Sequence, residues 1–346
     1  MKKVAYAVSR KLNSKVYVGD GFSSLQNYIN LDKTIIISDE NVFKLYANIF
    51  PNVPRVIVPS GENAKTFDVV QNVCSQLLSL KADRTTFLLA IGGGALTDCV
   101  GFVSSIFMRG VNFGFVPTTL LSQVDASVGG KNGINFADAK NMIGVINQPK
   151  FVLCDQSFFS TLSDVEYLSG FAEVLKHALI KDKKSFFEIE KDYENIVNRK
   201  STILPKLIYR SIKIKSAIVV KDENEKGLRR LLNFGHTVGH AIEVIEKIPH
   251  GYAVANGMAI AAKISNKLGF LDDSVLYKIL SVLKKFNYAT TINCDVNLIK
   301  EKLLKDKKRQ GVAVNFVLIS NIGNAFYYKI EISTLWGLLD DLCMHQ

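Results

Sequence analysis

Short apolar runs rich in β-branched residues alternate with amphipathic stretches through the first half of the chain. The runs predict strands at Lys15–Val18, Thr34–Ser38, Arg55–Val58, Phe87–Ile91, Phe113–Val116 and Phe151–Cys154. Between them, apolar residues recur at helical spacing in stretches such as Asn63–Leu80 and Ala95–Phe107. Strands that are apolar on both faces and alternate with helices indicate a doubly wound, mostly parallel sheet. We therefore predict an α/β domain over residues 1–157.

Long amphipathic stretches dominate the second half. They predict helices at Ser163–Lys181, Lys184–Arg199, Ile203–Val220, His236–Glu246, Ala253–Leu268 and Val275–Phe286. Two weaker strand-like runs, Val312–Ser320 and Ala325–Ile330, are joined by a Gly/Asn turn. We predict a second, mainly α-helical domain over residues 158–346, with a short connection near residues 155–162.

Length and composition narrow the class of protein. A chain of 346 residues can bury two cores, and no segment has the roughly 18 uninterrupted apolar residues that a membrane span requires. The N-terminal stretch Met1–Arg10 predicts an edge strand and not a signal peptide. Five widely spaced cysteines without a Cys-x-x-Cys pair indicate a reducing, cytoplasmic setting and no thiolate zinc site.

The positive charge does not by itself predict a nucleic-acid partner. The formal net charge is +11, but the lysines are spread along the whole chain. Dispersed charge is typical of a solvated surface, and no basic stripe is interleaved with aromatic residues that would stack on bases. Some of these lysines could instead converge on a small anionic substrate, because a basic cleft attracts phosphates and carboxylates.

Three of the five histidines, His236, His240 and His250, lie within fifteen residues. His236 and His240 are four apart, so they share one face of a helix. Two such imidazoles and a third ligand would hold a metal with an open catalytic position. The alternative is a core histidine and a loop histidine, but the clustering favours a metal site. Thr237 follows His236, so the motif lacks the glutamate of a zinc protease.

Three polar or glycine-rich turns follow predicted strands. Gly92–Gly94 joins a strand to a helix, which lets the backbone approach a pyrophosphate at the helix N-terminus. Thr97 occupies the place of the third glycine of the usual dinucleotide motif, so the triplet alone predicts little more than a tight turn. The turns Ser38–Asn41 and Pro59–Glu62 follow two other strands at the same edge, and an acidic residue there could hold a ribose. Together the three turns predict a dinucleotide site.

Other candidates for chemistry follow along the chain. The stretch Gln123–Asn132, followed by Lys140 and Asn141, predicts either an anion-binding loop or simply a solvated one. Glu173 and Lys176 lie one turn apart in an apolar helix, either as a metal ligand with its neighbour or as a surface ion pair. Arg229 and Asn233 precede the histidine helix and suit a carboxylate or phosphate.

Read in order, these motifs resemble 3-dehydroquinate synthase. The matching segments are Gly92–Asp98, Met108–Gly110, Pro117–Leu121, Val124–Lys131, Lys140–Gly144, Ala172–Lys176, Asp222–Arg229, Leu232–Glu243 and His250–Gly251. The resemblance implies an N-terminal NAD-binding sheet domain and a C-terminal helical metal-binding domain.

The same resemblance implies the reaction. The family converts 3-deoxy-D-arabino-heptulosonate 7-phosphate into 3-dehydroquinate and phosphate, in the shikimate pathway of aromatic amino acid biosynthesis. Transient oxidation of the C5 hydroxyl acidifies the C6 proton, phosphate leaves, and re-reduction precedes ring opening and aldol closure. The implied cofactors are NAD and Zn²⁺ or Co²⁺, and the partners are a phosphorylated acid sugar and a second subunit in a homodimer, with neither nucleic acid nor membrane.

Site residues are carried over position by position. Those that match metal ligands are Glu173, His236 and His250. Those that match NAD contacts are Asp39, Asn41, Glu62, Lys65, Gly93, Gly94, Asp98, Thr118, Thr119, Lys140 and Thr161. Those that match catalytic residues are His240, Lys176, Asp125 and Asn233, with His240 as the proton relay. Those that match substrate contacts are Lys131, Asn141, Lys215, Arg229, one of Lys307 or Lys308, and Arg109, which would reach a partner subunit's site.

Two departures and three rival interpretations remain. Tyr252 stands where the family has a glutamate beside the last metal ligand, and Ser169 stands where an asparagine is common. The rivals are another sugar-phosphate cyclase, a metal-dependent polyol dehydrogenase that releases NADH, and a basic binding protein on a dinucleotide fold. The last would leave the Glu–His–His set unexplained. Arg229, Lys131 and Lys215 favour a substrate with a carboxylate, which the sister cyclases' substrates lack.

Overall fold

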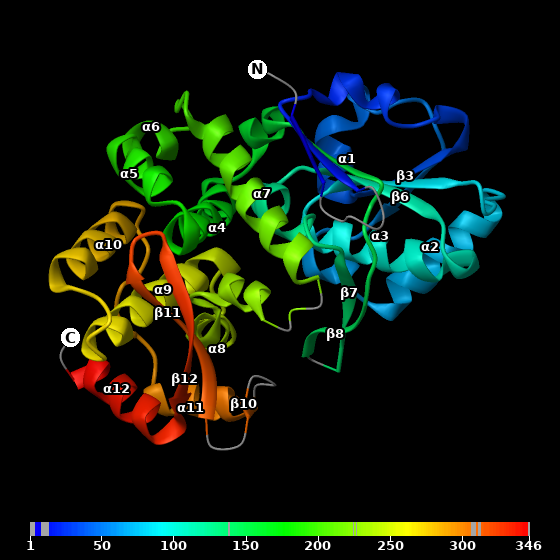
Figure 1. Ribbon diagram of the computed structural model, residues 1–346. Helices are drawn as coiled ribbons and strands as arrows, with labels where there is room; N and C mark the ends of the chain where they lie inside the picture. The colour runs from blue at the N-terminus through cyan, green and yellow to red at the C-terminus, as the bar shows by residue number, and fades with distance from the viewer. Residues whose placement is uncertain are drawn as a thin grey trace. The chain divides into compact units, whose positions relative to one another are not determined.

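The computed structural model describes residues 4–7, 14–137, 139–223, 225, 227–305, 309–310 and 313–344, and Figure 1 traces the chain. Contacts within the chain divide it into two units. The first comprises Met1–Ser163 together with Lys215–Val220, and the second comprises Asp164–Ile214 together with Lys221–Gln346. In the described part of the chain, no helix has the length and apolar character needed to span a membrane.

The first unit is built on a seven-stranded sheet in the order β1-β2-β9-β6-β5-β3-β4. The bounds are β1 Val4–Ala7, β2 Lys15–Val18, β3 Thr34–Asp39, β4 Arg55–Val58, β5 Phe87–Gly92, β6 Asn112–Pro117 and β9 Phe151–Cys154. Every pair of neighbours is parallel except β1 with β2, which places β1 antiparallel at the edge. The predicted mostly parallel sheet is thus confirmed, and its strand positions match the prediction closely.

Alternate residues of the strands explain how both faces of this sheet are covered. On one face, Ile36, Leu89, Ile91 and Leu153 form a core with aromatic residues of the short helical turns η1 (Phe22–Asn27) and η7 (Gln156–Thr161). Helices α2 (Phe67–Ser79) and α3 (Gly94–Ile106) pack on the sheet from the opposite side to α1 (Glu40–Tyr46) (Figure 1). Because both faces are covered, the strands are mostly apolar, which is the pattern seen in the sequence.

One element of the first unit, a β-hairpin, was not predicted, because its glycines are typical of a loop. The segment interpreted as a loop around Lys131 and Lys140 forms a hairpin of β7 (Lys131–Phe136) and β8 (Ala139–Ile146). Gly133 and Gly144 pair across the strands, where a Cβ on Gly133 would lie 2.6 Å from the backbone oxygen of Ile143. The prediction of a loop was wrong because these glycines serve the close approach of two strands.

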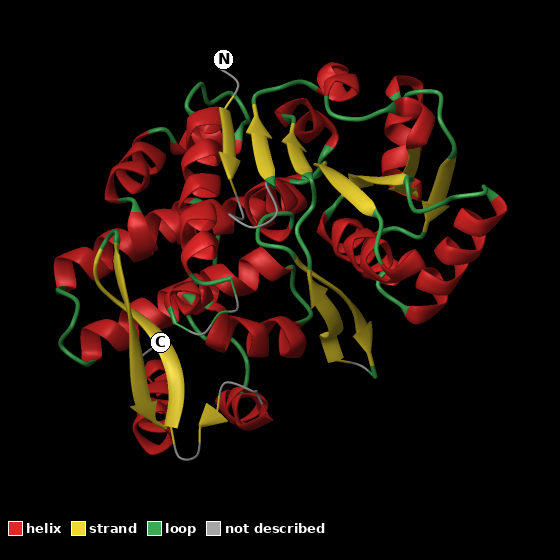
Figure 2. Cartoon of the chain, turned by 45° about the vertical axis from the view of Figure 1, so that its right-hand side comes forward, coloured by secondary structure: helices red, strands yellow, loops and turns green. Residues whose placement is uncertain are grey.

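The second unit is mostly helical, as predicted (Figure 2). Its helices are α4 Asp164–Lys181, α5 Lys183–Lys191, α6 Tyr193–Val197, most of α7 Leu204–Lys221, α8 His236–Glu246, α9 His250–Lys267, α10 Asp273–Lys285, α11 Val296–Lys305 and α12 Ile332–Met344. The single helix predicted over Lys184–Arg199 is two, which meet at Asp192. Strands β10 (Arg309–Gln310), β11 (Ala313–Asn321) and β12 (Asn324–Glu331) form a small antiparallel sheet.

Candidate active site

Three helices of the second unit bring a carboxylate and two imidazoles together. Glu173 lies in the middle of α4 and is fully buried, His236 begins α8, and His250 begins α9. The Glu173 Oε1 atom is 3.6 Å from His236 Nε2 and 3.8 Å from His250 Nε2. A carboxylate with two imidazoles is a donor set of catalytic zinc sites. The chemistry and convergence of these donors therefore fit the metal that the sequence predicts.

The second ring nitrogen of each of these histidines has its own partner. His236 Nδ1 lies 3.2 Å from the backbone oxygen of Phe234, and His250 Nδ1 lies 2.8 Å from Glu243 Oε2. Metal-binding histidines almost always bond an outer carboxylate or carbonyl through the nitrogen that does not face the metal. The pattern of bonds thus leaves the Nε2 atoms of both rings facing Glu173.

Close helix contacts through glycine create this convergence. A Cβ on Gly251, next to His250, would overlap the backbone oxygen of Ser169 on α4. A Cβ on Gly257 of α9 would overlap the backbone oxygen of Gly235, which precedes His236. Ser169 Oγ also accepts a 3.0 Å hydrogen bond from the Gly251 N–H. The serine that departs from the family pattern therefore caps the first turn of the helix that carries His250.

Lys176 and His240 lie beside the proposed ligands. Lys176 Nζ contacts the second carboxylate oxygen of Glu173, and both side chains are buried. The alternative of a surface Glu–Lys pair is therefore wrong. His240 is exposed and lies one turn after His236, with 5.0 Å between the two ring centroids. Nitrogen atoms of His236, His240 and His250 all lie within 4.8 Å of one another.

Glu243 also belongs to this cluster, because its carboxylate bonds His250, and no sequence motif suggested this role for it. Burial lowers the pKa of His250, but the nearby carboxylates of Glu173 and Glu243 outweigh burial and raise that pKa from 6.5 to about 9. Glu243 lies seven residues after His236 and three after His240 on one helix, and this spacing already placed it on the same helix face as both histidines. Tyr252, which stands where an acidic residue is usual, packs its ring 5.5 Å from that of Tyr288.

The predicted nucleotide residues of the first unit gather at the carboxyl ends of its parallel strands. Gly92 ends β5 and Gly93 caps α3. A Cβ on Gly92 would lie 2.8 Å from Asp39 Oδ2, and one on Gly93 would lie 3.3 Å from the Thr119 methyl carbon. The glycines thus place no side chain between the two strand-end turns, which suits the approach of a pyrophosphate to a helix N-terminus.

Asp39 connects two of these turns. Its Oδ1 atom accepts hydrogen bonds from the N–H groups of Asn41 and Val42, each 3.1 Å long, and so caps α1. It also accepts a 3.0 Å bond from the hydroxyl of Ser60, which follows β4. The other oxygen faces Gly92. Asp39 therefore has a structural role as a helix cap in addition to its predicted contact with a ribose.

Lys65, which is buried, and Asp98, which is partly buried, form an ion pair at the same edge. The distance between Lys65 Nζ and Asp98 Oδ2 is 2.7 Å, and Lys65 follows the helical turn η4 (Gly61–Ala64). Burial raises the pKa of Asp98 from 3.8 to about 6, although the positive charge of Lys65 opposes that shift. Asp98 thus changes its charge close to neutral pH.

The remaining predicted nucleotide residues occupy different environments. The Thr118 N–H donates a 2.9 Å bond to the Gly92 oxygen, and Thr119 Oγ1 accepts from the Ser122 N–H. Thr161 bonds the hydroxyl of Tyr46 across 2.6 Å at the end of α1. Lys140 is exposed on β8.

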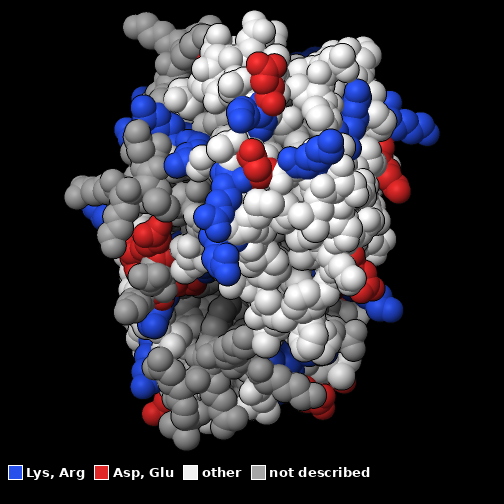
Figure 3. Space-filling view, turned by 90° about the vertical axis from the view of Figure 1, so that its right-hand side faces the viewer, with Lys and Arg blue, Asp and Glu red and all other residues white. Residues whose placement is uncertain are grey.

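Apart from Arg109, the predicted substrate residues of the first unit and the predicted catalytic residue Asp125 lie near the turn η6 (Ser122–Ala126) and on the hairpin. Lys215 Nζ donates to Oδ1 and to the backbone oxygen of Asp125, at 2.5 and 2.6 Å. Asp125 sits in a π-helical turn, a rare geometry that is frequent at functional sites. Lys131 is exposed at the start of β7, and Asn141 is on β8. The basic side chains of the face shown in Figure 3 are spread among acidic ones.

In the second unit, the predicted substrate residue Arg229 and the predicted catalytic residue Asn233 are held by the loop that precedes them. Arg229 is buried, its guanidinium donates a 2.6 Å bond to the Glu223 oxygen, and its N–H donates a 2.9 Å bond to Asp222 Oδ2. Asn233 donates a 2.7 Å bond to Glu225. Both lie on η8 (Leu228–Asn233), directly before α8. Lys307 and Lys308 lie outside the described residues.

Arg109 is the residue that the structure keeps apart from the others of the first unit. It is exposed on η5 (Phe107–Arg109), beyond the end of α3 opposite to the glycine turn. Thirteen residues of helix span about 20 Å. Met108 and Arg109 both have positive φ angles, 48° and 68°, a strained conformation that clusters at functional sites.

Comparison with known proteins identifies the family. Residues 55–169 match the model described as 3-dehydroquinate synthase N-terminal, and residues 170–309 match the model described as 3-dehydroquinate synthase C-terminal. The 3-dehydroquinate synthase of Campylobacter hominis is 43% identical over 272 residues, which cover 78% of each chain. The chain belongs to the 3-dehydroquinate synthase family. The predicted family, enzyme class and fold are thus confirmed.

Two solved structures of related cyclases share the fold of this 3-dehydroquinate synthase family member. A 2-deoxy-scyllo-inosose synthase, in complex with carbaglucose-6-phosphate, NAD⁺ and Co²⁺, has a TM-score of 0.85 at 26% identity over 98% of this chain and 100% of its own. A 2-epi-5-epi-valiolone synthase from Streptomyces hygroscopicus, with NAD⁺ and Zn²⁺ bound, has a TM-score of 0.86 at 25% identity over 100% of this chain and 99% of its own.

Proposed function

We propose that this protein is a 3-dehydroquinate synthase that converts 3-deoxy-D-arabino-heptulosonate 7-phosphate into 3-dehydroquinate and phosphate. The carrying observation is that His236 Nε2 and His250 Nε2 both lie within 3.8 Å of the same buried oxygen of Glu173. A binding protein on a dinucleotide fold has no use for such a cluster, whereas a cyclase needs a metal centre beside its substrate.

Two cofactors belong to this proposal, and each has residues that suit it. A divalent metal held by Glu173, His236 and His250 would supply Lewis-acid stabilisation of negative charge on substrate oxygens. NAD bound over Gly92–Gly94 would supply reversible hydride transfer, so that the reaction needs no external redox partner. We assign the nucleotide to a domain of residues 1–157 and the metal to a domain of residues 158–346.

His240 and Lys176 are the proposed proton-handling and charge-balancing groups. His240 is exposed one turn from His236, so its ring can meet substrate beside the proposed metal ligands and relay a proton. Lys176 is buried against Glu173 and places a positive charge beside that carboxylate, which balances its negative charge in the core. Asp125 and Asn233 complete the proposed catalytic set, and both are already oriented by bonds to Lys215 and Glu225.

The substrate's two anionic groups account for the remaining proposed contacts. Arg229 presents a planar guanidinium suited to a carboxylate. Its backbone N–H bonds the Asp222 carboxylate and its guanidinium bonds the backbone oxygen of Glu223, and these two bonds hold the side chain in place. Lys131 and Lys215 would add point charges, Asn141 an amide, and Lys307 or Lys308 a further ammonium group. A carboxylate contact at Arg229 would separate this substrate from the sugar phosphates of the sister cyclases.

Arg109 fits a role in a homodimer. Because α3 separates it by about 20 Å from the glycine turn of its own unit, it is poorly placed to serve that edge. We therefore propose that it reaches the site of a partner subunit.

The five cysteines are free, which supports a reducing, cytoplasmic setting.

One assay tests this function against its rivals. Purified protein is incubated with NAD⁺, Zn²⁺ or Co²⁺, and the heptulosonate phosphate, while phosphate release and NADH absorbance are followed together. We expect catalytic release of phosphate without net accumulation of NADH. Stoichiometric build-up of NADH would instead indicate a polyol dehydrogenase. Faster turnover of glucose 6-phosphate or sedoheptulose 7-phosphate would indicate a sister cyclase.

A further inference from the structure

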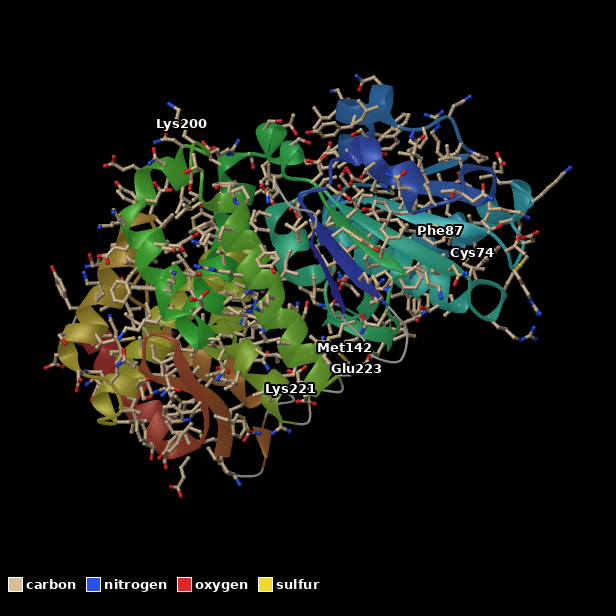
Figure 4. The ribbon with its side chains drawn as sticks, turned by 45° about the horizontal axis from the view of Figure 1, so that its top comes forward. Cys74, Phe87, Met142, Lys200, Lys221 and Glu223 are labelled. Carbon is tan, nitrogen blue, oxygen red and sulfur yellow. The ribbon has the colours of Figure 1, made fainter. Side chains whose placement is uncertain are left out.

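The β7–β8 hairpin carries an irregularity whose geometry points to a positioning residue. Ile134 pairs with Ile143 and Phe136 pairs with Ala139. One residue of β7, Asn135, therefore lies opposite three residues of β8, Lys140, Asn141 and Met142. Bulges of this kind interrupt the ladder and re-aim side chains, often beside active sites. Figure 4 labels Met142, which is 45% exposed next to Asn141.

Asn135 takes the place of the missing ladder bond. Its Oδ1 atom accepts a 3.0 Å hydrogen bond from the backbone N–H of Asn141, and its Nδ2 atom donates a 2.7 Å bond to Glu62 Oε2. The two partners fix the orientation of the amide, because a backbone N–H can only donate and a carboxylate can only accept. Its own N–H donates to the Lys65 oxygen across 2.9 Å.

The backbone and side chain of Asn141 are held by different groups. Asn141 has a φ angle of 55°, in the left-handed region that asparagine tolerates better than most residues. Lys65, which is buried, donates a 2.5 Å bond from Nζ to Asn141 Oδ1. Because the amide oxygen faces Lys65, the amide NH₂ group is what Asn141 presents to a ligand.

We propose that Asn135 is a positioning residue that sets two binding groups at once. Through Oδ1 it holds Asn141 in the conformation that offers an NH₂ donor to a substrate oxygen, and through Nδ2 it holds the Glu62 carboxylate for the nucleotide. This inference rests on the proposed function, which makes Glu62 a nucleotide contact and Asn141 a substrate contact. It adds Asn135, for which the sequence motifs suggested no role.

Two substitutions separate the effects of the two side-chain hydrogen bonds of Asn135, one to Asn141 and one to Glu62. Asn135→Ala removes both bonds. Asn135→Asp keeps an acceptor for the Asn141 N–H but replaces the donor to Glu62 with a like charge. Asn112→Asp is the matched control, because Asn112 is exposed at the start of β6 and gains the same charge. Circular dichroism and thermal unfolding establish that each variant is folded.

The readouts are the Kd of NAD⁺ by calorimetry, and KM and kcat for the heptulosonate phosphate at saturating NAD⁺. For Asn135→Ala we expect about a three- to tenfold rise in both Kd and KM, the size of one exposed hydrogen bond for each arm. For Asn135→Asp we expect the rise in the Kd of NAD⁺ but a substrate KM close to that of wild type. A general loss of packing would not produce that split.

The outcomes distinguish the inference from the function on which it rests. A substrate KM that rises equally in Asn135→Asp and Asn135→Ala would overturn the positioning role, as would wild-type values of Kd and KM in both. If the wild-type protein itself binds no NAD⁺ or turns over no heptulosonate phosphate, the proposed function fails instead.

Discussion

The two regions that carry the proposed site are built in different ways. In the first unit, polar turns follow neighbouring parallel strands. Asp39 and Ser60 meet because β3, which ends at Asp39, pairs with β4, which ends two residues before Ser60. In the second unit, Glu173, His236 and His250 come from three helices with no ladder to align them. They converge because glycines let those helices approach backbone to backbone.

This difference has consequences for how each region responds to change. A strand-end turn is held by its own strand, so a substitution there affects the local contact and leaves the rest of the edge intact. In the histidine cluster, all the donors would bind the same metal ion, so the loss of one donor weakens the binding of that ion by the others. We therefore expect larger effects from single substitutions in the histidine cluster than at the glycine turn.

The largest effect is expected for His236→Ala. Removing one of three protein donors should abolish stable metal binding and activity together, because the two remaining donors cannot complete a catalytic site. Metal content by atomic emission and turnover of the heptulosonate phosphate are the measurements, and NAD⁺ affinity should stay unchanged. One metal ion per chain with near-normal turnover would contradict the proposed ligand set.

A smaller effect is expected for Glu243→Gln, which keeps the size of the side chain but removes the charge that bonds His250. Loss of a carboxylate that bonds a metal-binding histidine typically weakens metal affinity by about 10- to 100-fold. Chelator competition measures this affinity, and the absorption spectrum of the Co²⁺-loaded protein should shift as well. Glu246→Gln, on the last residue of the same helix, is the control and should leave both unchanged.

At the glycine turn, Gly93→Val should weaken NAD⁺ binding by about tenfold, the lower part of what overpacking costs. Its Cβ would already lie 3.3 Å from the Thr119 methyl carbon, and two further methyl groups would occupy the path of the pyrophosphate. Calorimetry measures the Kd, and metal content should not change. Gly337→Val serves as control, since a Cβ there meets nothing within 4 Å. Equal NAD⁺ affinity in Gly93→Val and wild type would rule out this placement of the nucleotide.

The smallest effect concerns pH and Asp98. Its carboxyl takes up a proton as pH falls through about 6, well above the ordinary 3.8. The folded chain binds that proton more tightly than the unfolded chain, so stability rises as pH falls from about 6 towards 3.8. The same protonation removes the negative charge opposite Lys65. We expect NAD⁺ affinity to fall below pH 6 by at most about tenfold per pH unit. In Asp98→Asn this slope should disappear, and its persistence would assign the pH dependence to another group.

The first unit could be predicted in detail because its signals are local. A buried strand such as Phe151–Cys154 is a short apolar run, and a turn such as Gly92–Gly94 lies between such a run and a helix. Once the strands are parallel, their carboxyl ends must share an edge. The hairpin was not predicted, because glycines such as Gly133 and Gly144 are typical of loops. Only the structure shows that these two glycines pair across the strands.

In the second unit the sequence supplied the donors but not their geometry. The spacing of His236 and His240 indicated one helix face, yet nothing local indicated that Glu173 faces them or that Glu243 bonds His250. These contacts join residues far apart in the sequence or in different helices. Likewise, the proposed role of Asn135 depends on a β-bulge, and that bulge is visible only once the pairing of the two strands is known.

The central claim is that Glu173, His236 and His250 hold one divalent metal. Anomalous diffraction at the zinc absorption edge, from crystals of the zinc-loaded protein, tests it most directly. We predict a single strong peak about 2.0–2.2 Å from a Glu173 carboxylate oxygen and from Nε2 of His236 and His250. A peak bound by His236, His240 and His250 with Glu173 remote from it, or no peak near these side chains, would contradict the account.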